Sequence, residues 1–484
     1  MRARIVAASL TAVALLFGAA AAQAPLNVGA AAAARPRDPT VGAAGIGDPY
    51  FPNYGNGGYR IAHYDISIHY NRSTKRLVGH TVITGHARKR LTRFDLDLRI
   101  AASAVKVNGT VAHFTQTSHE LIVSPAHAIP RSGPMRVVID YEGIPSKLRS
   151  GGLGLWGLTS DGAFVAGEPE ASVLWFPAND HPLDKATFDI SVTIPTDQQV
   201  ISNGRLVHKS SSGNQTTWHW RETSPMATYL VYVAIGDFQI TRGTSPGGVP
   251  YILALSDHLG PLTSGASASL ALTPDVIDFY SKKFGPYPFA VAGGTVANAS
   301  FPFSLETQTR PIYSKVFFSS GGGTNENVIS HELAHQWFGD DVSVRAWRNV
   351  WLNEGFATWC SWLWAQHRGG RSTDGAFRST FHFYDTHNPK FWELSIGDPG
   401  VPTLFNEAVY QRGAMTLQAL QNVIGKSDFF RVLGTWVRKR GGAQGTIPQF
   451  EALAQRISGR HLAPFFKHWL FDQREPDQTV QNGF

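Results

Sequence analysis

The sequence has one cysteine, few charged residues and few long apolar runs. Because Cys360 is the only cysteine among 484 residues, the chain can form no internal disulfide bond and carries no cysteine near its N-terminus for lipid attachment. After the first residues, no segment is apolar enough to span a membrane. Charged residues make up 16% of the chain and the net charge is +7, with basic residues only in short clusters such as 88–90 and 438–440. A nucleic-acid partner is therefore not predicted.

The N-terminus has the pattern of an export signal. Arg2 and Arg4 precede a stretch rich in Ala, Leu and Val that ends near Ala22, and the residues around it are small enough for cleavage. We therefore predict a signal peptide over residues 1–24 and a secreted, extracellular protein with no stable membrane association after cleavage. An uncleaved membrane anchor is the alternative, but the high alanine content favours cleavage. Residues 25–45 are rich in Ala, Gly and Pro and are predicted to be a linker.

The remaining chain divides into two regions of different periodicity. Alternating apolar and polar residues at 63–70, 136–141 and 188–194 predict strands, and Gly, Pro and Asn separate such runs. Helical spacing dominates further along the chain. We expect an α+β protein in which an antiparallel, β-sandwich-like domain over residues 46–243 precedes a mainly helical domain over residues 244–484.

Two histidines four residues apart are the strongest chemical signal. In the pentapeptide HELAH at 331–335, His331 and His335 would share one face of a helix and present two imidazole nitrogens to one metal ion. Catalytic zinc sites use three nitrogen or oxygen ligands and leave a fourth position to water, and Glu354 is the natural third ligand. The sequence thus predicts one Zn²⁺ per chain, with Glu332 free to take a proton from water. Thr324 and Gly339 are the expected start and end signals of the helix.

The HELAH segment, the WFGD that follows it and the WLNEGFA at 351–357 together resemble the zinc aminopeptidases typified by aminopeptidase N, the gluzincin metallopeptidases. Other segments match the family in the same order along the chain. They lie at 175–182, 184–189, 201–204, 225–229, 284–289 and 409–415. The resemblance implies a thermolysin-like catalytic domain at 244–484. It also implies a short, two-domain form, because larger members of the family continue into a further helical domain.

The resemblance implies roles for four more residues. Tyr410 begins a YQRG segment where the family has Tyr-x-Lys-Gly, and this tyrosine is expected to donate a hydrogen bond to the substrate carbonyl oxygen. Glu306 occupies the glutamate position of the family's Gly-x-Met-Glu-Asn strand, although its neighbours differ here. In the β domain, Glu170 is the preferred second anchor for the substrate's amino group, and Glu168 is the weaker candidate.

These expectations favour a secreted zinc metallopeptidase that removes N-terminal residues from peptides. Two alternatives stay open at this stage. A metalloendopeptidase would have a more open cleft, consistent with the altered residues around Glu306. A non-catalytic secreted binding protein could retain the zinc site, but the presence of every expected catalytic group argues against it.

Overall fold

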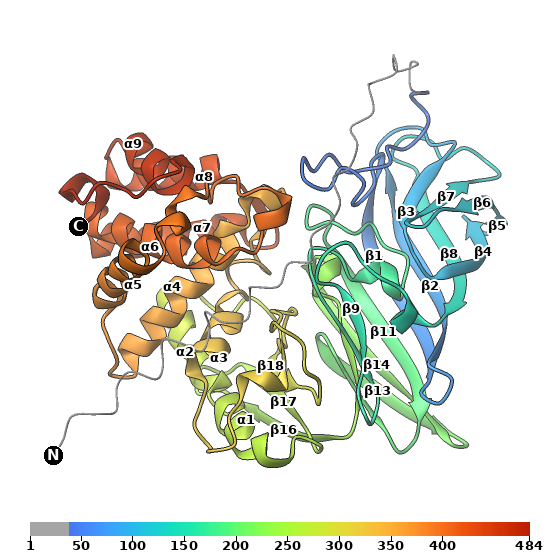
Figure 1. Ribbon diagram of the computed structural model, residues 1–484. Coiled ribbons are helices and arrows are strands. Elements are labelled where there is room, and N and C mark those ends of the chain that lie inside the picture. The colour runs from blue at the N-terminus through green and yellow to red at the C-terminus, as the bar shows by residue number, and fades with distance from the viewer. Residues whose placement is uncertain (1–37) are drawn as a thin grey trace.

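The computed structural model describes residues 38–484 and places two domains side by side (Figure 1). The predicted signal peptide, 1–24, and most of the predicted linker, 25–45, lie outside the described residues. The last part of that linker is paired with the β domain, where Val41 and Ala43 form β-bridges. A β-rich domain precedes a mainly helical one, so the predicted α+β fold class is confirmed.

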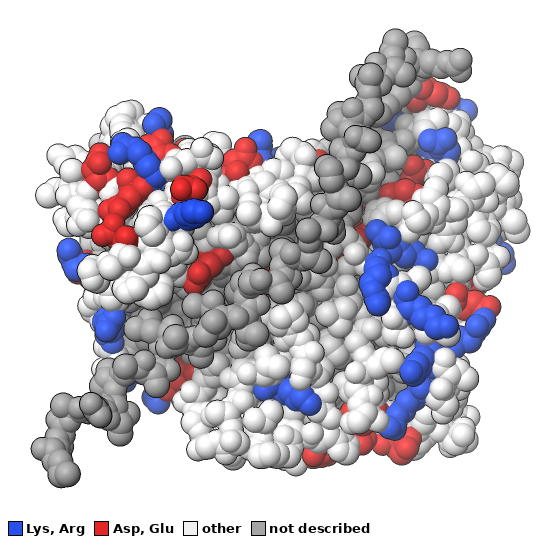
Figure 2. All heavy atoms as spheres, viewed as in Figure 1, with Lys and Arg blue, Asp and Glu red and all other residues white. Residues whose placement is uncertain are grey.

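The described surface adds two facts about possible partners. No helix within residues 38–484 combines the length and apolar character needed to cross a membrane. On the face seen in Figure 2, Lys and Arg side chains lie in short groups over the β domain, with Asp and Glu among them. The predicted lack of a nucleic-acid partner stays a prediction.

A large twisted sheet forms the body of the β domain. Its order is β13 (Arg205–Ser212), β14 (Gln215–Met226), β11 (Ala186–Pro195), β1 (Tyr59–Asn71), β2 (Arg76–Ala87), β8 (Pro134–Gly143), β4 (Ala101–Val107) and β5 (Thr110–Val111). The predicted antiparallel arrangement is wrong for one pair of neighbouring strands in this sheet, because β1 and β11 pair in parallel. Alternation reveals which face of a strand is buried but not the direction of its neighbour, and these two strands are far apart in sequence.

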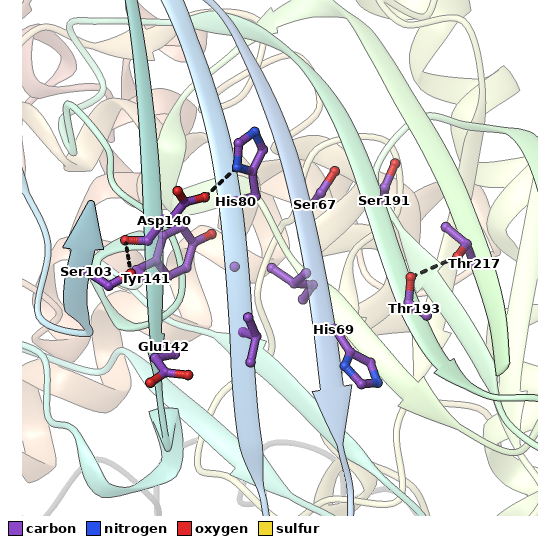
Figure 3. A pocket seen from close by; sticks show the side chains of 13 residues that line it. Ser67, His69, His80, Ser103, Asp140, Tyr141, Glu142, Ser191, Thr193 and Thr217 are labelled. Carbon is purple, nitrogen blue, oxygen red and sulfur yellow. Dashed lines mark hydrogen bonds and ion pairs between the residues drawn. The ribbon is translucent and has the colours of Figure 1, made fainter. Parts of the chain in front are cut away.

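The two faces of this sheet differ as the alternation predicts. On β1, Tyr64, Ile66 and Ile68 are buried and face the core. A smaller sheet covers this inner face, since Trp156 of β9 packs on Tyr70 with ring centroids 5.4 Å apart. The outer face is polar, and Figure 3 shows His80 hydrogen-bonded to Asp140 there. The smaller sheets are β12 (Gln199–Ser202), β15 (Val233–Gly236), β10 (Ala163–Ala166) and β9 (Leu155–Leu158), and β3 (Phe94–Asp97), β7 (Glu120–Ser124) and β6 (His113–Gln116).

The second domain begins with a small sheet and continues with helices. The sheet consists of β16 (Phe238–Thr244), β17 (Pro250–Ser256), β18 (Ala292–Val296) and β19 (Ile312–Tyr313). Because β16 pairs with β17, the predicted boundary at 243/244 falls inside a strand of this sheet. The helices are α1 (Thr263–Leu270), α2 (Thr273–Phe284), α3 (Glu326–Ala334), α4 (Trp351–His367), α5 (Thr373–His387), α6 (Glu407–Ile424), α7 (Lys426–Arg440), α8 (Ile447–Ser458) and α9 (Ala463–Phe466). A short pair, β20 (Ser343–Val344) and β21 (Gln444–Gly445), joins distant parts of this domain.

Buried polar contacts join the domains. Lys185 of the β domain donates hydrogen bonds to the backbone oxygens of Asp340 and Asp341, the latter at 2.9 Å. The amide of Asn203 donates to the Gln308 backbone oxygen at 2.8 Å. Because these donors are buried, a gap at this junction would leave them unpaired at a cost of about 1–3 kcal/mol each. The junction therefore holds the β domain at a defined distance from α3.

Candidate active site

Helix α3 carries the two predicted histidines. It begins at Glu326, after Asn325, whose side chain accepts a hydrogen bond from the Val328 N–H at 3.2 Å. Asn325 is therefore the N-cap, one residue after the predicted Thr324. The helix ends at Ala334, before the predicted stop at Gly339, where the backbone takes a φ of 140°.

The three predicted metal ligands converge on one point. The Nε2 atoms of His331 and His335 are 3.2 Å apart, and each lies close to Oε2 of Glu354, at 3.3 Å and 3.4 Å. A tetrahedral zinc ion with bonds of about 2.0–2.1 Å requires ligand atoms roughly 3.3 Å from one another. All three sides of this triangle match that spacing. The donor set therefore fits a zinc ion.

Hydrogen bonding fixes the orientation of one of these imidazoles. Nδ1 of His335 donates to the backbone oxygen of Phe338 at 3.0 Å, which places a proton on Nδ1 and directs Nε2 toward the other ligands. The ring is 1% exposed, so water does not compete for it. The arrangement presents His335 as a neutral, oriented nitrogen ligand whenever a cation is bound.

The electrostatics of the triangle favour cation binding. Burial raises the pKa of Glu354, but the charge of His335 and hydrogen bonds from both histidines outweigh it and lower this pKa to about 2. Burial lowers the pKa of His331. For His335 burial acts in the same direction, but Glu354 and Glu306 reverse it and raise the pKa. The carboxylate of Glu354 is therefore ionised at neutral pH.

Two glycines let the helices carrying Glu354 and Tyr410 meet. A Cβ atom on Gly413 of α6 would lie 2.7 Å from the Cα of Gly355 on α4, and one on Gly355 would lie 2.8 Å from the Cα of Gly413. Real Cβ atoms do not approach backbone so closely, so both positions require glycine. This explains the glycines that follow Glu354 and Arg412 in the two motifs. The crossing places the Tyr410 ring 6.0 Å from the His331 ring.

Tyr410 and Glu332 have environments that suit the predicted chemistry. Burial and the nearby carboxylates raise the pKa of Tyr410 well above its usual value, so the hydroxyl keeps its proton and can donate it to a hydrogen bond. Glu332 is 6% exposed and lies beside the ligands without being part of the triangle. Burial raises its pKa, with Glu306 and Glu354 adding to the effect and His335 opposing it. A raised pKa is typical of a carboxyl group that exchanges protons near neutral pH.

A second group of carboxylates lies next to the metal ligands. Glu168, Glu306 and Glu354 each offer an oxygen atom within 4.8 Å of the others. Glu306 accepts a hydrogen bond from the Tyr229 hydroxyl at 3.0 Å. Oε2 of Glu168 is buried and has no hydrogen-bond partner among the described residues. Burial and the carboxylates of Glu306 and Glu354 raise the pKa of Glu168, so a positively charged ligand would stabilise its ionised form.

The structure corrects the predicted order of the two β-domain anchors. Glu168, the weaker candidate, lies with Glu306, whereas Glu170 accepts hydrogen bonds from His119 and from the Gly151 N–H and does not join this group. The preference for Glu170 came from matching residues 168–170 to a Gln-x-Glu stretch of the family, and this segment lies after the end of β10 at Ala166, where the direction of each side chain depends on tertiary contacts.

Sequence reasoning assigned no role to Tyr229 or Gln336. Tyr229 belongs to a segment that matched the family, yet its contact with Glu306 joins the two domains across 77 residues. Gln336 follows the HELAH segment directly, and its amide donates to the Glu306 backbone oxygen at 3.1 Å and to Asp340 at 2.7 Å. Its position between the two zinc-site helices was the only available signal.

Comparison with known proteins identifies the family. Residues 61–230 match the Peptidase M1 N-terminal domain, and residues 318–469 match the Peptidase family M1 domain. The chain belongs to the M1 peptidase family. The resemblance drawn from the sequence motifs is thereby confirmed.

Solved structures and curated relatives agree with the M1 assignment. The M1 zinc metallopeptidase of Deinococcus radiodurans is 25% identical, with a TM-score of 0.79 over 89% of this chain and 98% of that one. A mutant of that enzyme bound to a Tyr-Ser-Ala substrate is 26% identical, with a TM-score of 0.80 over 90% of this chain and 100% of the mutant chain. The leucyl aminopeptidase of Saccharolobus solfataricus is 25% identical over 85% of this chain. Aminopeptidase M1-D of Oryza sativa subsp. japonica is 26% identical over 62% of this chain. The matches span 53% and 36% of these two relatives.

Proposed function

We propose that this M1 family member is a zinc-dependent aminopeptidase. The observation that carries the proposal is the placement of Glu168 and Glu306 beside the ligand triangle, where a buried oxygen of Glu168 has no hydrogen-bond partner within residues 38–484. A peptide's α-amino group has a pKa of about 8 and is mostly charged at neutral pH, so it needs an anionic partner in a buried site. Two carboxylates close to the metal ligands supply that partner.

The position of the amine determines which bond is cut. When Glu168 and Glu306 bind the ammonium group, the first peptide bond of the substrate is the one within reach of the ligand triangle. Tyr229 supports this function because its hydrogen bond holds one Glu306 oxygen and leaves the other for the substrate. Binding by the amine thus sets the register of the chain.

The remaining groups act on the peptide bond itself. A zinc ion held by His331, His335 and Glu354 would supply Lewis-acid chemistry that makes water nucleophilic near neutral pH. Glu332 would take the proton from the attacking water and pass it to the leaving amine. Tyr410 would donate a hydrogen bond to the carbonyl oxygen as negative charge develops there, an effect typically worth about 10²–10³ in rate.

The experiment compares free and N-acetylated peptides of one sequence, with products identified by mass spectrometry. We expect stepwise removal of N-terminal residues from the free peptide and little cleavage of the acetylated one. Glu332→Gln protein purified in the same way controls for contaminating peptidases. Equal wild-type rates on both peptides would instead support the metalloendopeptidase, and a zinc-loaded protein that cleaves neither would support the binding protein.

We also propose that the protein is secreted, on the basis of the predicted signal peptide at 1–24. Expression of the full chain in a bacterial host, followed by N-terminal sequencing of protein from the medium, tests this. Cleavage after one of residues 20–24 is expected, so the mature chain should begin between residues 21 and 25. Recovery of the intact chain in the membrane fraction would favour the uncleaved anchor.

A further inference from the structure

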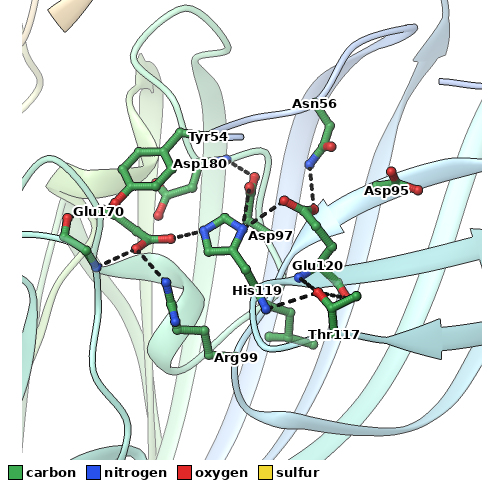
Figure 4. A network of polar contacts seen from close by, with 12 residues as sticks. Tyr54, Asn56, Asp95, Asp97, Arg99, Thr117, His119, Glu120, Glu170 and Asp180 are labelled. Atoms are coloured by element: carbon green, nitrogen blue, oxygen red, sulfur yellow. Dashed lines mark hydrogen bonds and ion pairs between the residues drawn. The ribbon is translucent and has the colours of Figure 1, made fainter. Parts of the chain in front are cut away.

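The Glu170 side chain belongs to a polar network inside the β domain (Figure 4). At its centre is His119, whose Nδ1 donates to Oε1 of Glu120 at 2.8 Å and whose Nε2 donates to Oε1 of Glu170. The ring also stacks on Tyr54, with centroids 5.5 Å apart and planes at 10°. Because each ring nitrogen faces a carboxylate, both nitrogens carry protons and the imidazole is a cation.

The charge of His119 is maintained by its neighbours. Burial lowers its pKa, but the hydrogen bonds to Glu120 and Glu170 outweigh this effect and raise the pKa to about 10. Arg99 lies 3.7 Å from the second Glu170 oxygen. Glu170 is thus held between two cations at neutral pH, although its side chain is fully buried. Such charge-assisted contacts are about twice as strong as neutral hydrogen bonds.

The network is connected to the backbone that carries Glu168. Oε2 of Glu170 accepts a hydrogen bond from the Gly151 N–H at 3.0 Å, and the Tyr54 hydroxyl donates to the Gly151 oxygen at 2.8 Å. Two residues further on, the Leu153 N–H donates to the Glu168 backbone oxygen at 2.9 Å. The loop at 150–154 therefore touches the segment 168–170 at both ends.

Glu168 needs such a restraint because its surroundings repel it. Its carboxylate lies within 4.8 Å of oxygens of Glu306 and Glu354, all three in a buried site. Carboxyl groups this close in a region of low dielectric disfavour one another's negative charge, and only a bound cation makes their convergence favourable. Without a firm backbone, the Glu168 side chain could move away from the other two carboxyl groups before a substrate arrives.

We propose that His119, Arg99 and Glu170 are positioning residues that hold residues 168–170 rigid and so keep the Glu168 carboxylate beside Glu306. The inference rests on the proposed function, in which Glu168 binds the substrate's ammonium group. Within residues 38–484, the hydrogen bonds and ion pairs of these three side chains go to groups other than Glu168, Glu306 and the metal ligands. Glu170 thus has a functional role different from the one that its sequence position indicated.

The test measures kcat and KM on the free tripeptide Tyr-Ser-Ala for His119→Phe and Glu170→Gln. His119→Phe keeps the ring that stacks on Tyr54 and removes both donors, while Glu170→Gln removes the charge that they hold. We expect KM to rise roughly tenfold in each variant, with kcat within about threefold and zinc content unchanged, because ammonium binding weakens while the ligand triangle is intact. Thermal unfolding verifies that each variant is folded.

His80→Phe is the matched control. His80 pairs with Asp140 at 2.6 Å in the same domain, but its side chain is 52% exposed on the outer face of the large sheet. Its substitution removes a similar ion pair and should leave KM unchanged. A rise in KM equal to that of His119→Phe would show that general loosening of the domain is responsible, and would overturn the proposal.

A double-mutant cycle with Glu168→Gln separates positioning from general damage. If His119 acts only through Glu168, then His119→Phe should change KM by less than about twofold in the Glu168→Gln background. An undiminished tenfold effect there would overturn the proposal. The proposal would also be overturned if His119→Phe and Glu170→Gln left KM unchanged while Glu168→Gln raised it. In that case the proposed binding of the substrate's amino group by Glu168 would still stand. If Glu168→Gln leaves KM unchanged, the amine site fails and the positioning role fails with it.

Metal analysis provides an independent check that protons, and not a metal ion, lie between His119 and its carboxylate neighbours. Asp97, His119 and Glu120 each offer a ligand atom within 4.8 Å of the others, a spacing that a metal ion could also bridge. We expect one zinc per chain in wild type and in His119→Phe. A second equivalent of metal that disappears in His119→Phe would show that His119 is a metal ligand, and would overturn its assignment as a cation between Glu120 and Glu170.

Discussion

Glu332→Gln is the most discriminating perturbation of the catalytic proposal. The substitution keeps the size of the side chain and removes its ability to accept a proton. A positioned general base typically contributes about 10²–10⁴ in rate, which corresponds to about 3–5 kcal/mol of transition-state stabilisation. We therefore expect kcat to fall by at least about 10², with KM within about threefold.

The structure indicates that this loss will not arise from lost metal or lost stability. Glu332 is not part of the triangle formed by His331, His335 and Glu354, so zinc should be retained. Burial raises the pKa of Glu332, which means that its charged form is disfavoured in the folded protein relative to the unfolded chain at neutral pH. A neutral glutamine removes that cost, so the unfolding temperature of the zinc-free protein should stay the same or rise.

The assay measures kcat and KM on a free tripeptide at pH 7, with zinc content from elemental analysis of the same sample. Glu326→Gln is the matched control, because Glu326 lies on the same helix, points to Arg368 at 3.3 Å and is 29% exposed. Its kcat should stay within about twofold of wild type. If Glu332→Gln raised KM and left kcat intact, Glu332 would be a binding group and the assignment of a general base would be refuted.

Three further predictions address the metal, the oxyanion and the helix crossing. His331→Ala should lose zinc and activity, and a chelator should abolish wild-type activity that added zinc restores. Tyr410→Phe should lower kcat by about 10²–10³ with little change in KM, since a donor needed mainly in the transition state is removed. Gly413→Ala should lower the free energy of unfolding by about 1–3 kcal/mol, because its Cβ would lie 2.7 Å from the Gly355 backbone.

Each of these predictions has a control and a contrary outcome. Full zinc occupancy with normal activity in His331→Ala would contradict the ligand assignment. Tyr384→Phe, at a tyrosine on α5 that pairs with Glu407, should leave kcat unchanged. If Tyr410→Phe behaved in the same way, Tyr410 would have only a packing role. Gly434→Ala on α7 should not be destabilising, because the nearest atom to its Cβ would be 3.7 Å away. Equal unfolding temperatures for Gly413→Ala and Gly434→Ala would refute the crossing argument.

The sequence alone predicts the candidate histidine ligands because their geometry is local. His331 and His335 share a face on any helix, so their spacing predicts the pair before the fold is known. The alternation of strands such as β1 likewise predicts which side chains are buried. Glu354, nineteen residues after His335, required knowledge of typical zinc ligands, and the structure places its Oε2 atom 3.3 Å from Nε2 of His331.

Only the tertiary structure decided which β-domain carboxylate lies beside the metal ligands. Glu168 and Glu170 have the same charge and are two residues apart, so local sequence does not separate them. The choice depends on His119, Arg99 and Gly151, which hold Glu170, and on the long-range approach of Glu306 from the other domain. The parallel pairing of β1 with β11 likewise depends on contacts between segments that are far apart in the sequence. Local periodicity determines the face that a residue presents, whereas the partner of that face is determined by contacts between segments far apart in the chain.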